Sequence, residues 1–208
     1  ILKEPKAKKI DTILTSHGQD RIDSYYRMSE RDNPDVLNYL HQENDYRNNF
    51  MSDYKNLEDK IFSEIKNRIK DDDSSVPYYD NGYFYYTKFE KEKQYPIYCR
   101  KKNLKSKEEV LIDVNIFSRG FDYYRVGSID ISPDNKIMAY SYDTLSRRLY
   151  TIKFIDLETG KEIGKSITNT SGGVSWANDN KTVFYDKKNI ETLRNEKVFK
   201  FNLYNGQA

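Results

Sequence analysis

The sequence has few of the residues that crosslink a chain or anchor it in a membrane. Its single cysteine, Cys99, excludes a disulfide within the 208 residues. No apolar run approaches the ~20 residues of a membrane-spanning helix, and no apolar signal segment is present. We therefore expect a cytoplasmic protein, or a periplasmic one if a leader has been removed, without membrane contact.

Catalytic motifs are also missing. There is no Gly-x-Ser-x-Gly turn, no glycine-rich phosphate loop and no His-Glu-x-x-His pair. Of the two histidines, His17 falls in an expected loop and His41 among polar residues of an expected helix. Cys99 has the flanks of a buried strand thiol rather than of a nucleophile. The sequence therefore predicts no catalytic residue, no metal ligand and no cofactor in this segment.

The charges are nearly balanced. The 35 basic and 33 acidic side chains leave a net charge of +2, too small to indicate a nucleic-acid partner. Residues 1–75 carry 13 basic and 16 acidic side chains, whereas residues 76–208 carry 22 and 17. This difference favours two domains, an N-terminal extended and helical segment over 1–75 and a β-rich domain over 76–208.

Tyrosine and phenylalanine are abundant, with 19 and 10 residues, and both suit half-buried strands. The β-rich part also contains an internal repeat. The stretch Ile129–Lys136 is echoed by Val174–Lys181 at an offset of 45 residues, and Asp156–Lys161 by Asn202–Gln207 at an offset of 46. A β-rich repeat of about 40 to 50 residues is typical of a propeller blade, a four-stranded sheet that needs neighbours to cover its faces.

The alternating pattern and the turn signals predict three blades, at about 76–114, 125–166 and 173–208, the last without its outermost strand. Trp176 aligns with Ile131, so we expect it in the core of the third blade. Because propellers close with about 4 to 8 blades, the sequence predicts part of a larger protein. The fold class is mainly β, a partial β-propeller preceded by helices, and its open edges favour self-association.

The N-terminal segment changes character near residue 33. Residues 1–31 have few periodic apolar positions, and we expect them to wrap over another surface. Asn33 can cap a helix that starts at Pro34. Apolar residues then recur at helical spacing, which predicts two helices or one kinked helix, at Val36, Leu37, Leu40, Tyr46, Tyr54, Leu57, Ile61, Ile65 and Ile69.

Two polar clusters are candidate functional sites. The first is an exposed linker that we interpret as an interdomain hinge, formed by Asp71, Asp72, Asp73, Ser74 and Ser75. It lacks the alternating ligands and the glycine of a calcium loop.

The second cluster is the pair Arg147 and Arg148, which comes shortly after Asp143-Thr144. The two guanidinium groups could receive a carboxylate from a substrate or from another domain. The alternative, which we favour on the sequence, is a surface ion pair between Asp143 and Arg147 that stiffens the turn and contributes ~1 kcal/mol or less.

Several stretches, in the same order and over nearly the whole chain, match a known family. They are His17-Gly18 through Tyr26; Tyr39-Leu40 with Glu43-Asn44 and Tyr46; Arg68 to Tyr78; Tyr95 to Arg100; Ser132 to Asn135; Asp143-Thr144 with Arg147-Arg148; and Trp176 to Lys181. On these residues the chain resembles the amino-terminal part of the oligopeptidase B group, within the prolyl oligopeptidase family of serine peptidases. It departs from the family at Arg27, where a Trp is usual, and at Ser146, where a Gly is common.

The resemblance implies a two-domain enzyme that cleaves short peptides after Arg or Lys. An α/β-hydrolase domain, to which the two N-terminal helices would contribute, carries Ser, Asp and His, and a propeller over it admits only short peptides. The catalytic triad would lie beyond Ala208, so the segment alone should be inactive. Its partners would be the peptide substrate and the C-terminal hydrolase domain.

Two other functions stay open on the sequence. One is a stand-alone propeller that binds protein or glycan through its rim. The other is a different hydrolase of the same superfamily, such as an acylaminoacyl or dipeptidyl peptidase. The gene sequence past residue 208 would distinguish the first, and assays on Arg- or Lys-ending reporter peptides the second.

Overall fold

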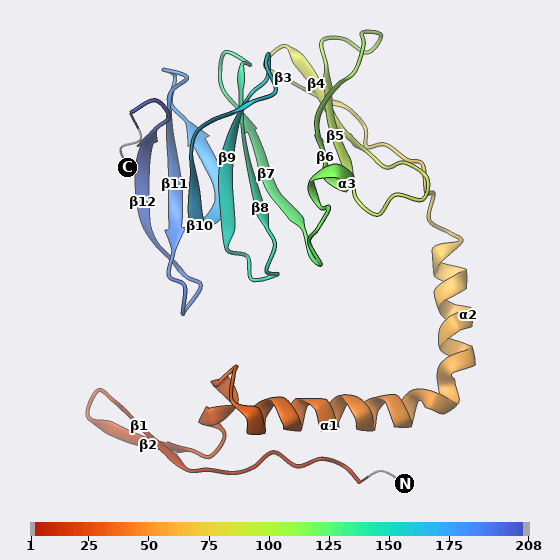
Figure 1. Cartoon of the computed structure of the whole chain (residues 1–208), viewed down its shortest axis with the longest axis vertical. Helices are drawn as coiled ribbons and strands as arrows, with labels where there is room; N and C mark the ends of the chain where they lie inside the picture. Colours follow the sequence, from red (N-terminus) through yellow and green to blue (C-terminus); the bar gives the residue numbers. More distant parts are fainter. Residues whose placement is uncertain (1–2, 206–208) are drawn as a thin grey trace. The chain divides into compact units, whose positions relative to one another are not determined.

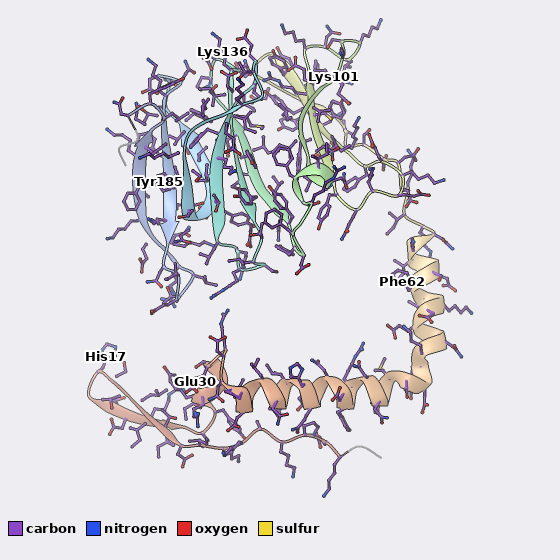
Figure 2. The ribbon with its side chains drawn as sticks, in the orientation of Figure 1. His17, Glu30, Phe62, Lys101, Lys136 and Tyr185 are labelled. Carbon is purple, nitrogen blue, oxygen red and sulfur yellow. The ribbon has the colours of Figure 1, made fainter. Side chains whose placement is uncertain are left out.

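A helical unit and a β-sheet unit meet between Ile69 and Lys70 in the computed structural model, which describes residues 3–205 (Figure 1). The N-terminal unit opens with a hairpin of β1 (Thr12–Ser16) and β2 (Gln19–Asp23). His17 and Gly18 form its turn with φ angles of 53° and 76°, and Figure 2 shows His17 at the tip. The sequence analysis missed this hairpin, because its strands are short and mostly exposed.

The predicted helices are present. After a 3-10 turn at Tyr26–Ser29, α1 (Pro34–Met51) begins where expected, and the backbone N–H of Asp35 donates to the Asn33 side chain at 2.9 Å. A second 3-10 turn, Ser52–Tyr54, joins α1 to α2 (Lys55–Lys66), and the chain changes direction there (Figure 1). The expectation of two helices or one kinked helix is therefore confirmed.

The apolar stripe of these helices is largely uncovered. On α1 only Val36 is buried, and within the N-terminal unit α2 buries no residue. Leu57, Ile61 and Ile65 of α2 are 47 to 56% exposed. An amphipathic helix owes most of its stability to packing of its apolar face, and the apolar face of α2 is exposed instead.

The first blade is a four-stranded antiparallel sheet. Its strands lie in sequence order, β3 (Tyr78–Asp80), β4 (Tyr83–Lys88), β5 (Ile97–Lys101) and β6 (Glu109–Asp113). A short helix, α3 (Val114–Phe117), leads from β6 toward the second blade. Asn81 and Gly82 form the turn between β3 and β4, both at positive φ.

The second and third blades form one continuous six-stranded sheet. Its strands are β7 (Arg125–Ile131), β8 (Ile137–Asp143), β9 (Tyr150–Asp156), β10 (Glu162–Trp176), β11 (Thr182–Lys188) and β12 (Asn195–Asn202). The 15-residue β10 belongs to both blades, because Glu162–Thr170 pairs with β9 and Thr170–Trp176 pairs with β11. Within the described residues the third blade has three strands.

Gly172 lets β10 pass from one blade to the next. Its φ is +105°, and a Cβ there would lie 2.9 Å from Ser141 Oγ and 3.1 Å from the buried Tyr150 ring. Gly127 of β7 approaches the same two side chains, and its Cβ would lie 2.5 Å from Ser141 Oγ. Two glycines therefore keep the inner strands of adjacent blades in close contact.

Each seam between blades has its own hydrophobic core. Ile112, Val114 and Tyr124 meet Met138 and Tyr140 between the first and second blades. Phe154 of the second blade stacks on Phe201 of the third with ring centroids 5.9 Å apart. Trp176 packs against the same core, edge-on to Phe154, so its predicted core position is confirmed. Apolar side chains thus pack across both seams between blades, as a propeller requires.

The repeated turns fasten one blade to the next. Asn81, Asn135 and Asn180 occupy equivalent turns after the inner strands, with φ angles of 42°, 63° and 59°. The Asn81 side-chain amide donates to the Pro133 carbonyl at 2.8 Å, and the backbone N–H of Asp134 donates to Asn180 Oδ1 at 3.0 Å. The sequence repeat therefore marks a structural device that recurs in every blade.

Candidate functional site

The Arg147-Arg148 loop joins β8 to β9 and is organised by a buried carboxylate. Asp143, 1% exposed, accepts the backbone N–H of Leu145 at 2.8 Å and that of Arg148 at 2.6 Å. Ser146 and Arg148 both have positive φ angles, 57° and 56°. Glycine adopts this conformation without strain, so both residues carry a backbone cost that the loop contacts must offset.

The expected surface ion pair between Asp143 and Arg147 is absent among the described residues, so this prediction was wrong. The Asp143 carboxylate is buried and accepts hydrogen bonds from backbone N–H groups, so it does not pair with the Arg147 guanidinium. Arg147 is half-buried, and its Nε is buried without a hydrogen-bond partner. Arg148 is exposed, and its carbonyl accepts the Lys188 ammonium at 2.9 Å. The loop thus presents two arginines without a carboxylate partner among residues 3–205.

The linker is exposed, as its charges predict, but its second half is attached to the first blade. Asp73 O accepts the N–H of Phe89, and the N–H of Ser75 donates to Thr87 O, each at 2.8 Å. These bonds hold Asp73, Ser74 and Ser75 along the end of β4. Asp71 and Asp72 lie outside this strand-like pairing.

The linker and the arginine loop lie on the same rim of the blades. Strands β4 and β8 are the second strands of their blades, and the linker borders the end of one while the arginine loop comes after the end of the other. The asparagine turns precede these strands and therefore lie at the opposite rim, which Figure 2 marks with Lys136. The structure thus brings the two predicted sites to one rim.

A cavity of about 560 Å³ lies between the first and second blades and reaches the third. Its polar side chains include Tyr78 and Asp80 from β3, Asp130 from β7 and Trp176 from β10. The sequence analysis named Trp176 as core and did not identify the others as functional. The alternation along β7 was the available signal, since it puts polar Ser128 and Asp130 on one face of an inner strand.

Charge is concentrated at this cavity. Burial raises the pKa of Asp130 above its ordinary value, against the lowering effect of hydrogen bonds from the Ser128 hydroxyl and the Val174 N–H. Burial, and after it the negative charges of Asp80 and Asp130, raises the pKa of Tyr78. A carboxylate held in a cleft at a desolvation cost is typical of a functional position.

The remaining candidates carry no reactive chemistry. Cys99 is 1% exposed, which confirms the predicted buried thiol, and burial raises its pKa to about 12. Across residues 3–205, no three His, Cys, Asp or Glu side chains cluster as metal ligands. No helix in the same range is long and apolar enough to cross a membrane.

Repeated sheets that pack face to face, joined by a strand that crosses from one blade to the next, define a partial β-propeller. The chain belongs to the prolyl oligopeptidase family, because residues 5–207 match its N-terminal β-propeller domain. This family consists of serine peptidases, which are hydrolases. The predicted family and fold class are confirmed.

Two curated relatives carry peptidase names. Dipeptidyl aminopeptidase BI of Pseudoxanthomonas mexicana is 40% identical over 92% of this chain, and Protease 2 of Moraxella lacunata is 32% identical over 88%. The aligned region spans 29% and 28% of these relatives. The chain therefore corresponds to less than a third of each relative's length.

Solved structures of oligopeptidase B resemble the whole chain. The Leishmania major enzyme has a TM-score of 0.88 at 30% identity and matches 98% of this chain. The Trypanosoma brucei enzyme, solved in a closed form with covalently bound antipain, has a TM-score of 0.84 at 26% identity and matches 99%. Each match spans 31% of the solved chain.

Proposed function

We propose that this chain is the N-terminal and propeller part of a serine oligopeptidase that cleaves short peptides after Arg or Lys. The observation that carries the proposal is the similarity to oligopeptidase B over 98% of the chain, with a TM-score of 0.88. In this proposal the propeller controls access to a catalytic domain. The triad is supplied from outside these 208 residues, and the segment alone is inactive.

The uncovered stripe of α2 supports a missing catalytic domain. Leu57, Ile61 and Ile65 present one apolar face at helical spacing, and no described residue buries it. Burying such a face stabilises a protein by roughly 25 cal/mol per Å² of apolar surface. In our proposal the hydrolase domain covers this face, so the N-terminal helices belong to that domain structurally.

The arginine loop would face the catalytic domain. Arg147 and Arg148 lie on the rim at which the linker joins the blades. Asp143 fixes the loop through backbone donors and leaves both guanidinium groups available. We propose that they receive a carboxylate, from the peptide substrate or from the hydrolase domain.

The linker would act as the interdomain hinge. Asp73 to Ser75 is held to β4, so Asp71 and Asp72 are the residues whose backbone would bend. Three adjacent carboxylates repel one another and keep this stretch solvated. Opening at this point would admit peptides, and closure would exclude water from the reaction.

The proposal is tested by assaying the full-length enzyme on N-blocked reporter peptides that end in Arg, Lys, Leu or Pro before the scissile bond. We expect cleavage after Arg and Lys only, and loss of activity with a serine-directed inhibitor. An enzyme that cleaves equally after Leu would contradict the specificity. A full-length protein with no hydrolase activity would instead favour the stand-alone binding module.

A second candidate is an aminopeptidase that removes dipeptides. It is favoured by the 40% identity to a dipeptidyl aminopeptidase. The two candidates differ in what they require at the substrate N-terminus. Matched reporters with free and acetylated termini distinguish them, because a dipeptidyl aminopeptidase loses activity on the acetylated peptide and an endopeptidase does not.

A further inference from the structure

The cavity between the first and second blades is not used by the proposed peptidase function. Its volume of about 560 Å³ lies within the range of sites that hold small ligands. Its lining combines apolar side chains, among them Leu111, Val126 and Ile129, with the carboxylates of Asp80 and Asp130. The cavity can therefore accept a group that is apolar along its length and charged at its end.

The charge of the cavity selects the sign of that group. Two carboxylates line it, and none of its lining residues is Lys, Arg or His. The neighbouring Arg100 is 4% exposed and is already paired, with its Nε 2.8 Å from Glu109 Oε2. The local field is therefore negative and favours a cation.

Asp130 has an oxygen that is available to a ligand. Both hydrogen bonds that its carboxylate receives from the described residues end on Oδ2, from Ser128 Oγ at 2.6 Å and from the Val174 N–H at 3.5 Å. Tyr78 and Trp176 line the same cavity, and the Trp176 indole donates to the backbone carbonyl of Asp130 at 3.1 Å. A carboxylate next to aromatic rings is a favourable environment for guanidinium and alkylammonium groups.

We propose that this cavity binds an organic cation on an aliphatic arm, namely an alkylguanidinium or alkylammonium group. Asp130 accepts the charged end, Asp80 adds a second carboxylate, and Tyr78 and Trp176 supply aromatic faces. The group can come from an Arg or Lys side chain or from a free amine. The proposal does not depend on peptidase activity, because binding is measured without cleavage.

The chain contains its own reporter for the test. Trp176 is its only tryptophan and lines the cavity, so its fluorescence responds to an occupant. The chain is titrated with N-butylguanidinium and with N-butylurea, a neutral analogue of similar shape. We expect a saturable change with the cation and none with the urea. Equal responses to both ligands would overturn the proposal.

Charge removal gives the decisive comparison. Asp130→Asn retains an oxygen for Ser128 and Val174, and we expect it to weaken N-butylguanidinium binding about tenfold, since a charged hydrogen-bond partner is lost. Asp80→Asn should weaken binding less. The matched control is Asp122→Asn, an exposed aspartate outside the cavity. Wild-type affinity in Asp130→Asn, with thermal unfolding intact, would refute the site.

The source of the cation is identified with a blocked peptide. Acetyl-Gly-Arg-Gly-amide that binds as tightly as N-butylguanidinium assigns the cavity to peptide side chains. A peptide that fails to bind, beside a small cation that does, assigns it to free guanidines and amines. Either result is separate from the reporter-peptide assay, so failure of binding leaves the proposed peptidase function untouched.

Discussion

Asp143 and Asp130 are carboxylates of the second blade, and their environments differ. Asp143 is buried, whereas Asp130 is half-buried. Asp143 is surrounded by backbone donors and serves to shape the arginine loop. Asp130 lies at a cavity, where desolvation is the main influence on its pKa and raises it. The first carboxylate accepts the hydrogen bonds that hold its loop, whereas the second carries a desolvation cost when it is charged.

Asp143→Ala should destabilise the protein. The substitution removes the buried acceptor of the Leu145 and Arg148 N–H groups, and losing these hydrogen bonds should cost about 2 kcal/mol. Asp143→Asn, which keeps one acceptor oxygen, should cost less. Denaturant-induced unfolding measures both, with the exposed Asp122→Ala as control. A loss no larger than that of the control would show that the carboxylate does not hold the loop.

Asp130 predicts a pH dependence of stability. Its pKa is raised in the folded protein, so the folded state binds this proton more tightly than the unfolded state. The contribution of Asp130 to the free energy of unfolding is therefore fully present below the ordinary aspartate pKa of about 4. It is lost as the pH rises through the pKa of Asp130 in the folded protein.

Replacement by asparagine removes this ionisation. Asp130→Asn should be more stable than the wild type at pH 7, with the advantage shrinking as the pH falls toward about 4. The neighbouring Asp80 and Tyr78 are unchanged in both proteins, so the difference isolates Asp130. Thermal unfolding across this range is the measurement, and a variant that is less stable at pH 7 would contradict the prediction.

At the scale of elements, the blades are joined by turns as well as by apolar faces. Each inner strand ends in a tight turn whose asparagine adopts the left-handed conformation. Asparagine suits this place for two reasons, because it tolerates positive φ and because its side chain can bond to the turn of a neighbouring blade. A glycine would satisfy only the first requirement.

Asn180 allows the two requirements to be separated. Asn180→Gly keeps the turn conformation but loses the acceptor for the Asp134 N–H, which should cost about 1 kcal/mol. Asn180→Ala also forces alanine into the left-handed region, which adds about 1 kcal/mol. Chemical denaturation should therefore rank wild type above Gly and Gly above Ala, and the exposed Asn178→Ala should be neutral. Equal stability of the Gly and Ala variants would contradict this account.

At the scale of the whole molecule, apolar surface is left uncovered in both units. Besides the stripe on α2, Phe184 and Val198 of the third blade are 42% and 71% exposed on strands β11 and β12. The edge strand β12 also offers backbone groups for pairing. These surfaces fit a segment that folds against further parts of a longer protein.

The isolated segment should therefore self-associate. Light scattering after size exclusion should show a mass that rises with protein concentration. The double variant Phe184→Gln with Val198→Thr should lower that mass, because it removes apolar surface from the open face. The matched control is Ile13→Thr with Ile22→Thr on the exposed hairpin. A monomer at all concentrations would contradict the prediction.

The proposed hinge is tested in the full-length enzyme. Replacing Asp71-Asp72 with Pro-Pro stiffens the part of the linker that no strand holds and leaves the bonds of Asp73 and Ser75 intact. If opening limits turnover, kcat should fall, and more for long peptides than for short ones. The same replacement at Glu90-Lys91, an exposed loop pair, is the control. Unchanged rates for both peptide lengths would exclude a hinge at this place.

Much of the architecture can be predicted from the sequence alone. The tandem repeat, the cap at Asn33 and the turn at Asn135 are local features, because they depend on backbone preferences of a few neighbouring residues. The amphipathic stripe of α2 was equally readable. The hairpin over Thr12–Asp23 was not, because short exposed strands leave a weak alternation.

Which residues come together at the candidate sites depends more on the tertiary structure. The repeat of the blades, the places of their turns and the family resemblance could all be predicted from the sequence, because periodicity and turn chemistry depend on neighbouring residues. Only the packing of one blade on another decided that the Asp130 carbonyl meets the Trp176 indole and that Asp80 and Asp130 line one cavity. Such contacts join residues far apart in the chain, and their burial and charge exist only once the sheets face each other.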